Sequence, residues 1–494
     1  MDNVMMANKY INDNLNNVDR KYQPTYHAVS PVGWVNDPNG FSFYNDKIHL
    51  FFQFYPYKPN WGPMHWGHYT STDFIKWELH PVALAPGEVY DKDLGAFSGS
   101  AVVKDGKHYL FYTGVADDLQ QQCAAISEDG INYVKVNTNP VVTKEMLPDK
   151  YSKIDFRDPY VFLHAGIYYM ILGTKKASFG NIVMFKSLDL LNWEFVGEVM
   201  NSDSPNNVNF YQWDGVYECP SFAYVDGVGI LISSPQNLPT DKSNFENISS
   251  NIYIVGDFDF TSGKFTYDKF MDLDGGFDFY AAQTTKMPDG RVILIAWMQM
   301  WGREFVTSED NWVGAFTLPR ELSYRNGHLY QNPVREIYNY RTGKVSYNNI
   351  VIKENESLKL DNISGNTIEL ELTIKVNDSL KTGVKLFKGT TNETLVYYDK
   401  ESSTVIIDRS KSGIVIKGEE ENISTRSTYI NLIDGFFKLH IFLDISSVEV
   451  FINDGYKTLT ANVYPKDDDL GIEFFSIGGS SIIKEIDKYS IIIK

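Results

Sequence analysis

Short segments of alternating hydrophobic and polar residues, separated by turn residues, run through the first two thirds of the chain. Residues 41–44 and 48–52 are one such pair, and the polar triplet 45–47 between them predicts a hairpin. From about residue 25 to about residue 330, turn signals recur about every 8–12 residues, and long amphipathic helical patterns are absent. The pattern predicts an all-β fold, preceded by a polar, Asn-rich extension or short helix over residues 1–24.

A faint repeat runs through this region. Its pattern is Ser-x-Asp-x-x-x-aromatic, and it occurs at residues 71–77, 127–133 and 187–193, with a weaker match near Asp257. The aspartates at positions 73, 129 and 189 lie 56 and 60 residues apart. A unit of about 60 residues holds about four short strands, which is the size of one propeller blade. About 300 residues at this spacing predict five blades, and a stack of sandwich domains is the alternative.

The composition changes near residues 331–350. All nine tryptophans precede this point, and strands rich in Ile, Val and Leu follow it, for example residues 368–374 and 448–452. Asn453-Asp454-Gly455 predicts a hairpin turn. We therefore expect three parts: an N-terminal extension (1–24), a five-bladed propeller (25–335) and a two-sheet sandwich (336–494). The acidic run at residues 417–421 is expected to be a solvated turn.

Charge and cysteine content narrow the classes of function. The 494 residues hold 45 basic and 63 acidic side chains, a formal net charge of −18, which argues against nucleic acid or an anionic membrane as the partner. Only Cys123 and Cys219 are cysteines, which predicts a reducing compartment. The first residues lack a signal-peptide pattern and no apolar run approaches a membrane span, so we expect a cytoplasmic protein. Aromatic residues at 15% suit both β structure and stacking on sugars.

Three acidic residues share one local setting. Asp37, Asp158 and Glu218 each lie at, or one residue from, an x-Pro step that leads into an apolar strand. Asp158 follows Asp37 by 121 residues and Glu218 follows Asp158 by 60, which are about two blade spacings and one. Equivalent places in successive blades face the same central axis, so the three carboxylates are expected to converge. Ordinary turn chemistry, with Asp37 in a tight turn before Asn39-Gly40, is the alternative interpretation.

Converging carboxylates suit the cleavage of a glycosidic bond. One acid must be ionised to act as a nucleophile, and another must carry a proton for the leaving group. Arg157, next to Asp158, is expected to hold that acid in its ionised form.

The motifs around these acids resemble those of glycoside hydrolase family 32, which includes invertases, inulinases, levanases and sucrose-6-phosphate hydrolases. The acidic motifs are residues 34–40 (WVNDPNG), 156–159 (FRDP) and 218–220 (ECP). Residues 51–56 (FFQFYP), 61–68 (WGPMHWGH) and 97–100 (FSGS) look like the family's sugar-contact motifs, and 441–451 (IFLDISSVEVF) resembles its sandwich signature. The resemblance spans residues 24–480 and independently implies a five-bladed propeller followed by a β-sandwich. Tyr217 and Ser221 depart from it, since the family often has Trp and an acidic residue there.

The resemblance implies a retaining fructosidase that needs no metal or cofactor. Asp37 would attack the anomeric carbon of the fructosyl unit, Glu218 would act as acid and then base, and Asp158 would stabilise the transition state. Substrate contacts are expected from Trp34, Asn36, Gln53, Trp61, Phe97, Ser98, Arg157, Tyr280 and Trp297. The histidines at 49, 65, 68 and 80 lack the hard-ligand cluster of a metal site, and Cys219 is expected to be a packed thiol.

The expected activity is hydrolysis of the β-D-fructofuranosyl bond of sucrose or sucrose 6-phosphate. His65, His68 or Arg303 is the candidate for a phosphate contact. Hydrolysis of fructo-oligosaccharides and transfer of fructose to another sugar are alternatives, and a non-catalytic sugar-binding propeller is the rival from another class. Whether the chain forms a homodimer stays open.

Overall fold

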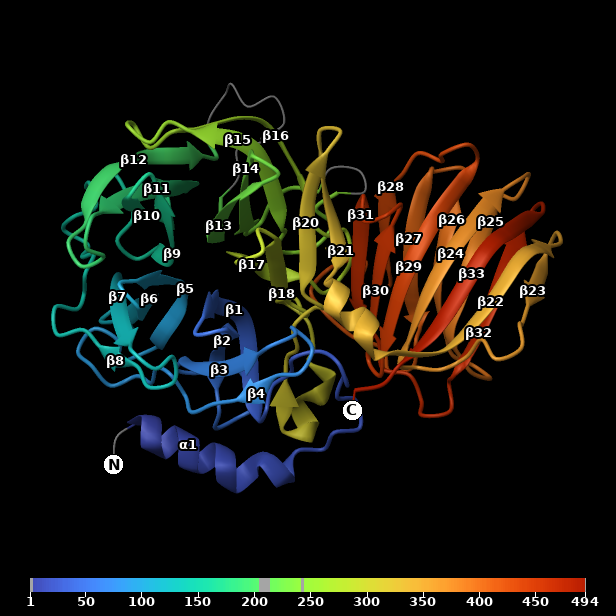
Figure 1. Ribbon diagram of the computed structural model, residues 1–494, viewed down its shortest axis with the longest axis horizontal. Coiled ribbons are helices and arrows are strands. Elements are labelled where there is room, and N and C mark those ends of the chain that lie inside the picture. The colour runs from blue at the N-terminus through green and yellow to red at the C-terminus, as the bar shows by residue number, and fades with distance from the viewer. Residues whose placement is uncertain (1–2, 204–213, 241–243, 494) are drawn as a thin grey trace.

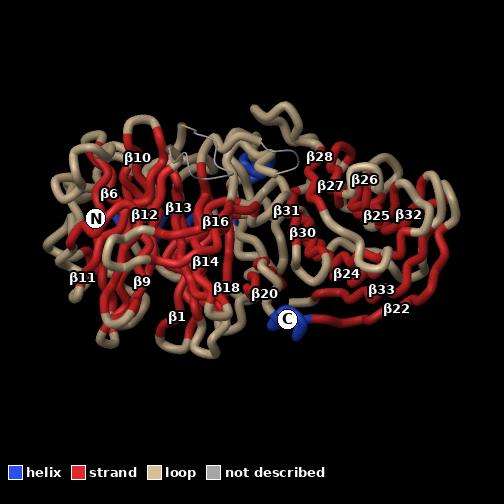
Figure 2. Tube along the Cα trace, turned by 90° about the horizontal axis from the view of Figure 1, so that it is seen from above, coloured by secondary structure: helices blue, strands red, loops and turns tan. Residues whose placement is uncertain are grey.

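A computed structural model describes residues 3–203, 214–240 and 244–493. Five small antiparallel sheets lie around a common centre, and a two-sheet sandwich lies beside them (Figure 1). Seen at right angles to that view, the two parts lie side by side along the long direction of the molecule (Figure 2). The expected N-terminal extension contains a helix, α1 (Asn3–Asn14), followed by the short turn η1 (Leu15–Asn17). Within the described residues, no helix combines the length and apolar character needed to cross a membrane.

Each of the five sheets is one blade, and we number the blades in chain order. Blade I contains β1 (Gly33–Tyr44), β2 (Lys47–Tyr55), β3 (His65–Ser71) and β4 (Glu78–Leu79), with β19 (Trp312–Val313) added at its inner edge. Blade II contains β5 (Gly95–Lys104), β6 (Lys107–Ala116), β7 (Leu119–Ser127) and β8 (Val134–Lys135). Blade III contains β9 (Phe156–His164), β10 (Ile167–Lys176), β11 (Phe179–Ser187) and β12 (Glu194–Asn201). Blade IV contains β13 (Tyr217–Val225), β14 (Val228–Pro235), β15 (Ile252–Phe258) and β16 (Phe265–Asp272). Blade V contains β17 (Tyr280–Lys286), β18 (Val292–Trp297), β20 (Arg320–Arg325) and β21 (His328–Pro333).

The first strand of each blade is its innermost strand, and the five first strands form a ring. β1 neighbours β5, β5 neighbours β9, β9 neighbours β13, β13 neighbours β17, and β17 returns to β1. The segment between β18 and β20, which includes the turn η2 (Val306–Asp310), also supplies β19, which pairs in parallel with β1 and so ties the last blade to the first. The predicted five-bladed propeller is confirmed.

The Ser-x-Asp repeat marks the end of the third strand in blades I to III. In each copy, one Asp carboxylate oxygen accepts hydrogen bonds from the backbone N–H groups two and three residues further on. The serine hydroxyl of the same copy donates to that aspartate at 2.9–3.1 Å. The repeat is therefore a recurring turn cap.

The C-terminal part is a sandwich of two six-stranded sheets, as predicted. A 3-10 turn, η3 (Arg335–Tyr340), leads into it from blade V. One sheet has the order β22 (Arg341–Ile352), β33 (Ser481–Ile491), β24 (Ile368–Val376), β29 (Phe436–Asp444), β30 (Ser447–Ile452), β31 (Lys457–Asn462). The other has the order β23 (Glu356–Leu358), β32 (Gly471–Ile477), β25 (Lys381–Lys388), β26 (Glu393–Asp399), β27 (Thr404–Lys411), β28 (Thr425–Tyr429). Alternate residues of both sheets form one apolar core of Ile, Val, Leu and Phe.

Buried ion pairs join the sandwich to the propeller. Arg320 on β20 is fully buried and contacts Asp274 at 2.9 Å and Glu449 of the sandwich at 2.7 Å. His27 lies between Asp444 and Glu449, 2.9 Å from each. A salt bridge this deeply buried holds two surfaces in one relative position, because separating them would leave charges without partners in a dry environment.

Candidate active site

The innermost strand of every blade carries a β-bulge near its start. The extra residues fall between Val35 and Pro38 in β1, between Phe97 and Gly99 in β5, between Arg157 and Tyr160 in β9, between Glu218 and Ser221 in β13, and between Tyr280 and Gln283 in β17. A bulge interrupts the alternation of side chains and re-aims one of them. The alternative interpretation, that Asp37 lies in a tight turn, is wrong: residues 33–44 form one strand, and the Asp-Pro step lies in a bulge, where a residue without an N–H group is tolerated.

Asp37 accepts hydrogen bonds from three side chains. Its Oδ2 accepts from the Ser98 hydroxyl at 2.6 Å, and its Oδ1 accepts from the Asn36 side-chain amide at 3.0 Å. The Cys219 thiol lies 3.4 Å from Oδ2. Burial raises the pKa of Asp37 above its ordinary value, although these donors oppose the rise, and the charge of Glu218 adds to it. The carboxylate is therefore held in one orientation by its hydrogen-bond donors.

Asp158 lies in the bulge of β9 with a left-handed backbone (φ +64°). Its Oδ2 accepts from the backbone N–H of Cys219 at 2.9 Å, and its own N–H donates to the Thr113 hydroxyl at 3.0 Å. Burial raises the pKa of Asp158, and the nearby Arg157 only partly opposes this. Arg157 therefore favours the ionised form of Asp158, as expected, but against a larger opposing effect of burial.

The guanidinium of Arg157 binds Glu218. Its Nη2 and Nε lie 2.8 and 3.1 Å from Glu218 Oε1, and its Nη1 lies 3.0 Å from Asp155. The Tyr280 hydroxyl donates to the other oxygen of Glu218, Oε2. Burial, followed by the charge of Glu218, raises the pKa of Tyr280, so the phenol keeps the proton that it donates. Glu218 is thus oriented through both oxygens, and its side chain is 17% exposed, which leaves it open to a ligand.

These residues line a cavity of about 540 Å³ at the centre of the ring. Ten of the twelve residues predicted for the site line it: Asn36, Asp37, Gln53, Trp61, Phe97, Ser98, Arg157, Asp158, Glu218 and Tyr280. Trp61 is 38% exposed and lies edge-on to Phe97, with ring centroids 6.0 Å apart. The cavity therefore combines three carboxylates with aromatic surfaces, as a sugar site requires.

Trp34 and Trp297 are the two predicted contacts that do not line the cavity. They are 2% and 0% exposed and belong to an aromatic cluster behind its wall. Trp34 reaches the site only through its indole N–H, which donates to Asn36 Oδ1 at 2.7 Å. The prediction of direct contact by these two residues is corrected to support of the wall.

Six lining residues were not found from the sequence: Gln120, Gln236, Asn237, Ile248, Ser249 and Trp301. Most of them lie in segments that follow β14 or β18 and belong to no motif. The pairing of Glu218 with Ser234 places the residues after Pro235 beside the acid, but this register is visible only once the strands are paired.

The candidates for a phosphate contact face elsewhere. His65, His68 and Arg303 are at most 7% exposed, and none of them lines the cavity. Arg303 is already bound to Asp278 at 3.0 Å and to Glu420 at 2.5 Å. None of the three is therefore placed to hold a phosphate in this cavity.

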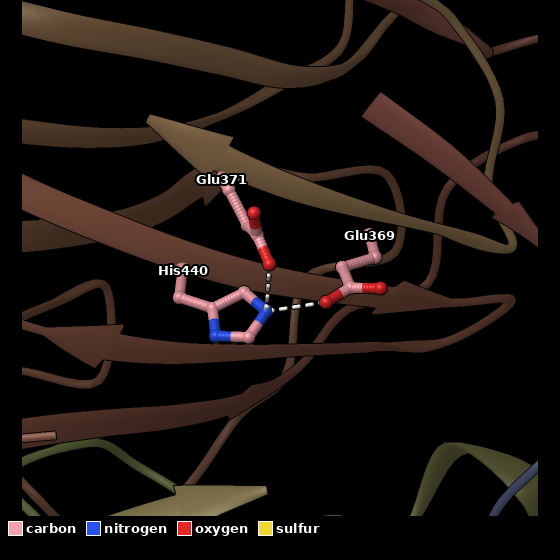
Figure 3. Close-up of side chains that lie close together, drawn as sticks. All are labelled: Glu369, Glu371 and His440. Atoms are coloured by element: carbon pink, nitrogen blue, oxygen red, sulfur yellow. Dashed lines mark hydrogen bonds and ion pairs between the residues drawn. The ribbon is translucent and has the colours of Figure 1, made fainter. Parts of the chain in front are cut away.

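One group of side chains has the spacing of a metal site, and it lies in the sandwich. Glu369, Glu371 and His440 are the only such group among the described residues (Figure 3). The guanidinium of Arg341 is paired with both glutamates. A cation already neutralises this group, so we read it as an ion-pair network rather than a metal centre.

Comparisons with known proteins agree with this geometry. Residues 27–333 match the model of the glycosyl hydrolases family 32 N-terminal domain, and residues 336–490 match that of the family's C-terminal domain. The chain is 34% identical over 492 residues to the sucrose-6-phosphate hydrolase of Zymomonas mobilis subsp. mobilis, which covers 95% of this chain and 92% of that protein.

Solved structures give the same result. The sucrose-6-phosphate hydrolase from Lactobacillus gasseri superposes with a TM-score of 0.85 at 29% identity, over 98% of this chain and 96% of that one. A β-fructofuranosidase from Bombyx mori, solved with sucrose, superposes with a TM-score of 0.83 at 32% identity, over 99% and 97%. The likeness therefore covers both the propeller and the sandwich.

Proposed function

The chain belongs to glycosyl hydrolase family 32, and on that premise we propose that it is a β-fructofuranosidase that hydrolyses sucrose or sucrose 6-phosphate. The observation that carries the proposal is the convergence of Asp37, Asp158 and Glu218 from three different blades on one cavity. A sugar-binding propeller without catalysis would need the aromatic surfaces but not three converging carboxylates, two of them buried at a cost in free energy.

The reaction proceeds in two steps at one carbon. Asp37 attacks the anomeric carbon of the fructosyl unit and forms an ester through one carboxylate oxygen, while Glu218 gives its proton to the departing oxygen. Glu218 then removes a proton from water, which breaks the ester and releases fructose with its configuration retained. The Ser98 and Asn36 hydrogen bonds fix the direction of attack, which lowers the entropic part of the barrier.

Asp158 and Arg157 complete the assignment. Asp158, held by the Cys219 N–H, accepts hydrogen bonds from fructosyl hydroxyls and stabilises the positive charge that develops at the ring. Arg157 orients Glu218 and contributes to the floor of the cavity beside it. Asn36, Gln53, Phe97 and Ser98 are assigned to the fructosyl half of the site.

The division at residues 335/336 and a cytoplasmic location are part of the proposal. The chain passes from β21 through η3 to β22 at this division, so no strand is cut by it. Cys123 and Cys219 are both free thiols, which suits a reducing compartment.

The test is a substrate panel with product identification. We expect turnover of sucrose, sucrose 6-phosphate or both, with fructose released as the β-anomer first. A kcat/KM for sucrose 6-phosphate well above that for sucrose assigns the phosphorylated sugar, and the reverse assigns the free sugar. Preference for inulin or levan would shift the assignment to fructan hydrolysis, and absence of turnover on every fructoside would overturn the proposal.

A further inference from the structure

The acidic run of the sandwich is not the solvated turn that its composition predicts. It lies in the segment between β27 and β28, and this segment crosses to the propeller. Glu419 and Glu421 are exposed, but the side chain of Glu420 between them is only 8% exposed. A single buried acid within a charged run indicates a specific contact.

Glu420 binds two segments of the propeller. Its Oε1 accepts from the backbone N–H of Ile248 at 2.8 Å. Its Oε2 accepts from Arg303 Nη2 at 2.5 Å and from Arg426 of the sandwich at 2.8 Å. Both oxygens are thus used, and one carboxylate neutralises charge from two guanidinium groups.

Backbone pairing reinforces the contact. The N–H of Glu304 donates to the carbonyl of Lys417 at 2.8 Å, and the N–H of Glu419 donates to the carbonyl of Gly302 at 2.9 Å. Arg303 and Gly418 face each other across this short antiparallel bridge. The sandwich therefore binds the segment that follows Trp301 through both backbone and side-chain contacts.

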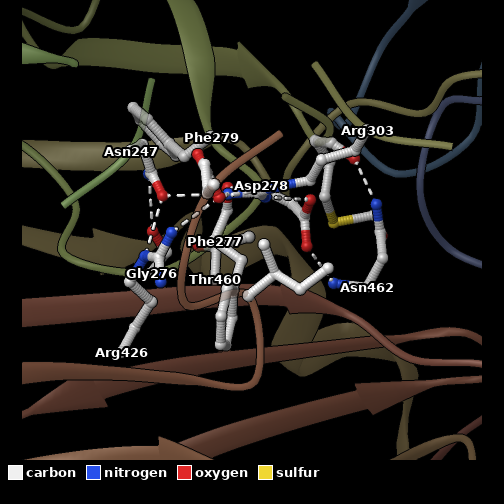
Figure 4. A network of polar contacts seen from close by, with 12 residues as sticks. Asn247, Gly276, Phe277, Asp278, Phe279, Arg303, Arg426, Thr460 and Asn462 are labelled. Carbon is white, nitrogen blue, oxygen red and sulfur yellow. Dashed lines mark hydrogen bonds and ion pairs between the residues drawn. The ribbon is translucent and has the colours of Figure 1, made fainter. Parts of the chain in front are cut away.

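Asn247 forms a second contact between propeller and sandwich. Its side-chain oxygen accepts from Arg303 at 3.1 Å and from Arg426 at 2.9 Å, and its amide donates to the carbonyl of Gly276 at 2.8 Å (Figure 4). Arg426 and Arg303 come from different domains, so the position of residue 247 depends on both.

The two propeller segments that contact the sandwich, residues 247–249 and 301–304, contribute to one wall of the cavity. Ile248 and Ser249 line it from the first segment, and Trp301 lines it from the second. This wall continues into Gln236, which bridges to Ser249 and follows directly after the strand paired with Glu218. Since Glu218 protonates the leaving oxygen in the proposed reaction, the wall lies on the side of the leaving group.

We propose that Glu420 of the sandwich is a positioning residue for the leaving-group side of the catalytic cavity. It does not line the cavity and touches no substrate. It acts through Ile248 and Arg303, and so gives the sandwich domain a part in substrate recognition. This inference rests on the proposed function, because it takes Glu218 to be the acid.

The experiment compares Glu420→Gln with two matched controls, Glu419→Gln and Glu421→Gln, whose side chains are exposed. Glutamine keeps the volume but loses the charge that holds two arginines. We expect KM for sucrose to rise about tenfold in Glu420→Gln, the effect of losing roughly one well-formed contact, with kcat changed less. The inhibition constant of fructose, which fills only the fructosyl half, should stay within about twofold. Both controls should match the wild type.

A second substrate separates positioning from general damage. With methyl β-D-fructofuranoside, whose leaving group is methanol, Glu420→Gln should match the wild type in kcat/KM, so that only the ratio between the two substrates changes. Equal losses on sucrose, methyl fructoside and fructose binding, or no loss on any of them, would overturn the inference.

A variant that does not fold and a wild type without activity have distinct consequences. If Glu420→Gln does not fold, Glu420→Asp retains the charge with a shorter reach and should show the same selective loss; an unchanged substrate ratio in that folded variant would contradict the inference. If the wild type itself cleaves no fructoside, the proposed function fails rather than the role of Glu420.

Discussion

The cavity and the contact between propeller and sandwich both contain several charged side chains, but the two regions differ in the ratio of cations to carboxylates. The cavity is lined by three carboxylates and a single guanidinium, that of Arg157. At the contact between propeller and sandwich, five cations meet five carboxylates: Arg303, Arg320, Arg409, Arg426 and His27 with Asp274, Asp278, Glu420, Asp444 and Glu449. The matched set stabilises one arrangement of two domains, whereas the unmatched set leaves carboxylates available for chemistry.

The pKa directions follow from this balance. Burial raises the pKa of Asp37 and Asp158, and their partners do not reverse it. Burial acts in the same direction on Glu449, but hydrogen bonds from His27 and the charge of Arg320 bring its pKa below the ordinary value. Burial alone would lower the pKa of His27, and its two carboxylate partners raise it to about 9. Carboxylates are buried in both regions, but only at the contact between the domains do enough cations lie close to lower the pKa of a buried carboxylate.

Removing one cavity carboxylate should reduce activity far more than stability. Asp37→Asn should lower kcat by at least about 10⁴-fold, because no other group is placed to bond to the anomeric carbon. The free energy of unfolding should stay the same or rise, because a buried charge without a cation is removed. Steady-state kinetics and urea unfolding measure the two effects, and turnover close to that of the wild type would refute the assignment.

Removing a cation from the contact between propeller and sandwich should reduce stability more than activity. Arg320→Met should lower the free energy of unfolding by about 3–5 kcal/mol, because it leaves Asp274 and Glu449 as buried carboxylates that lose a partner. Activity per folded molecule should persist. Arg325→Met is the matched control, because Arg325 lies on the same strand and is exposed. A loss of activity without a loss of stability would contradict the structural role of Arg320.

A smaller change tests how the cavity orients its acid. Tyr280→Phe removes the hydroxyl that donates to Glu218 and keeps the ring. We expect kcat/KM to fall about 10- to 100-fold, the range for one hydrogen bond to a charged group, together with a shift of the pH profile. Phe97→Tyr, which adds a hydroxyl elsewhere in the cavity, serves as a comparison; an unchanged pH profile in Tyr280→Phe would exclude the role.

The charge balance also predicts how stability depends on pH, through the buried histidines. His27 has its pKa raised to about 9, so its contribution to stability is full below about pH 6.5 and is lost as pH rises through 9. Burial lowers the pKa of His49 and His65 to about 4, so their contribution is full above about pH 6.5 and is lost as pH falls through 4.

Urea unfolding between pH 4 and 10 measures both limbs. The free energy of unfolding should be greatest near pH 6.5, and His27→Gln should flatten the alkaline limb only. An alkaline limb that is unchanged in His27→Gln would show that another group causes it.

The sequence predicts the fold better than it predicts the walls of the site. The strand pattern, the Ser-x-Asp repeat and the change of composition near residue 331 are local signals, so five blades and a sandwich follow from them. The three acids could be singled out because each lies at, or one residue from, an x-Pro step and because they recur at blade spacing. The bulge at Asp37, by contrast, depends on the pairing of β1 with β2, and the turn signal of Asn39-Gly40 gives no account of that register.

Long-range contacts explain the remaining misses. Trp34 and Trp297 are aromatic residues beside motifs, but their burial is decided by packing against Trp301 and Phe305. Glu420 looks solvated in its acidic run, and only the crossing of the sandwich segment to Arg303 buries it. Arg157 is adjacent to Asp158 in sequence, but its guanidinium binds Glu218, which only the folded chain brings close.

Trapping the covalent intermediate tests whether Asp37 is the nucleophile of a two-step reaction. Glu218→Gln, incubated with a β-fructofuranoside that carries an activated leaving group, should accumulate an ester because the base for its hydrolysis is absent. Mass spectrometry of the digested protein should find one fructosyl unit on the peptide that contains Asp37. A fructosyl unit on any other residue, or direct release of fructose with inverted configuration, would contradict the account.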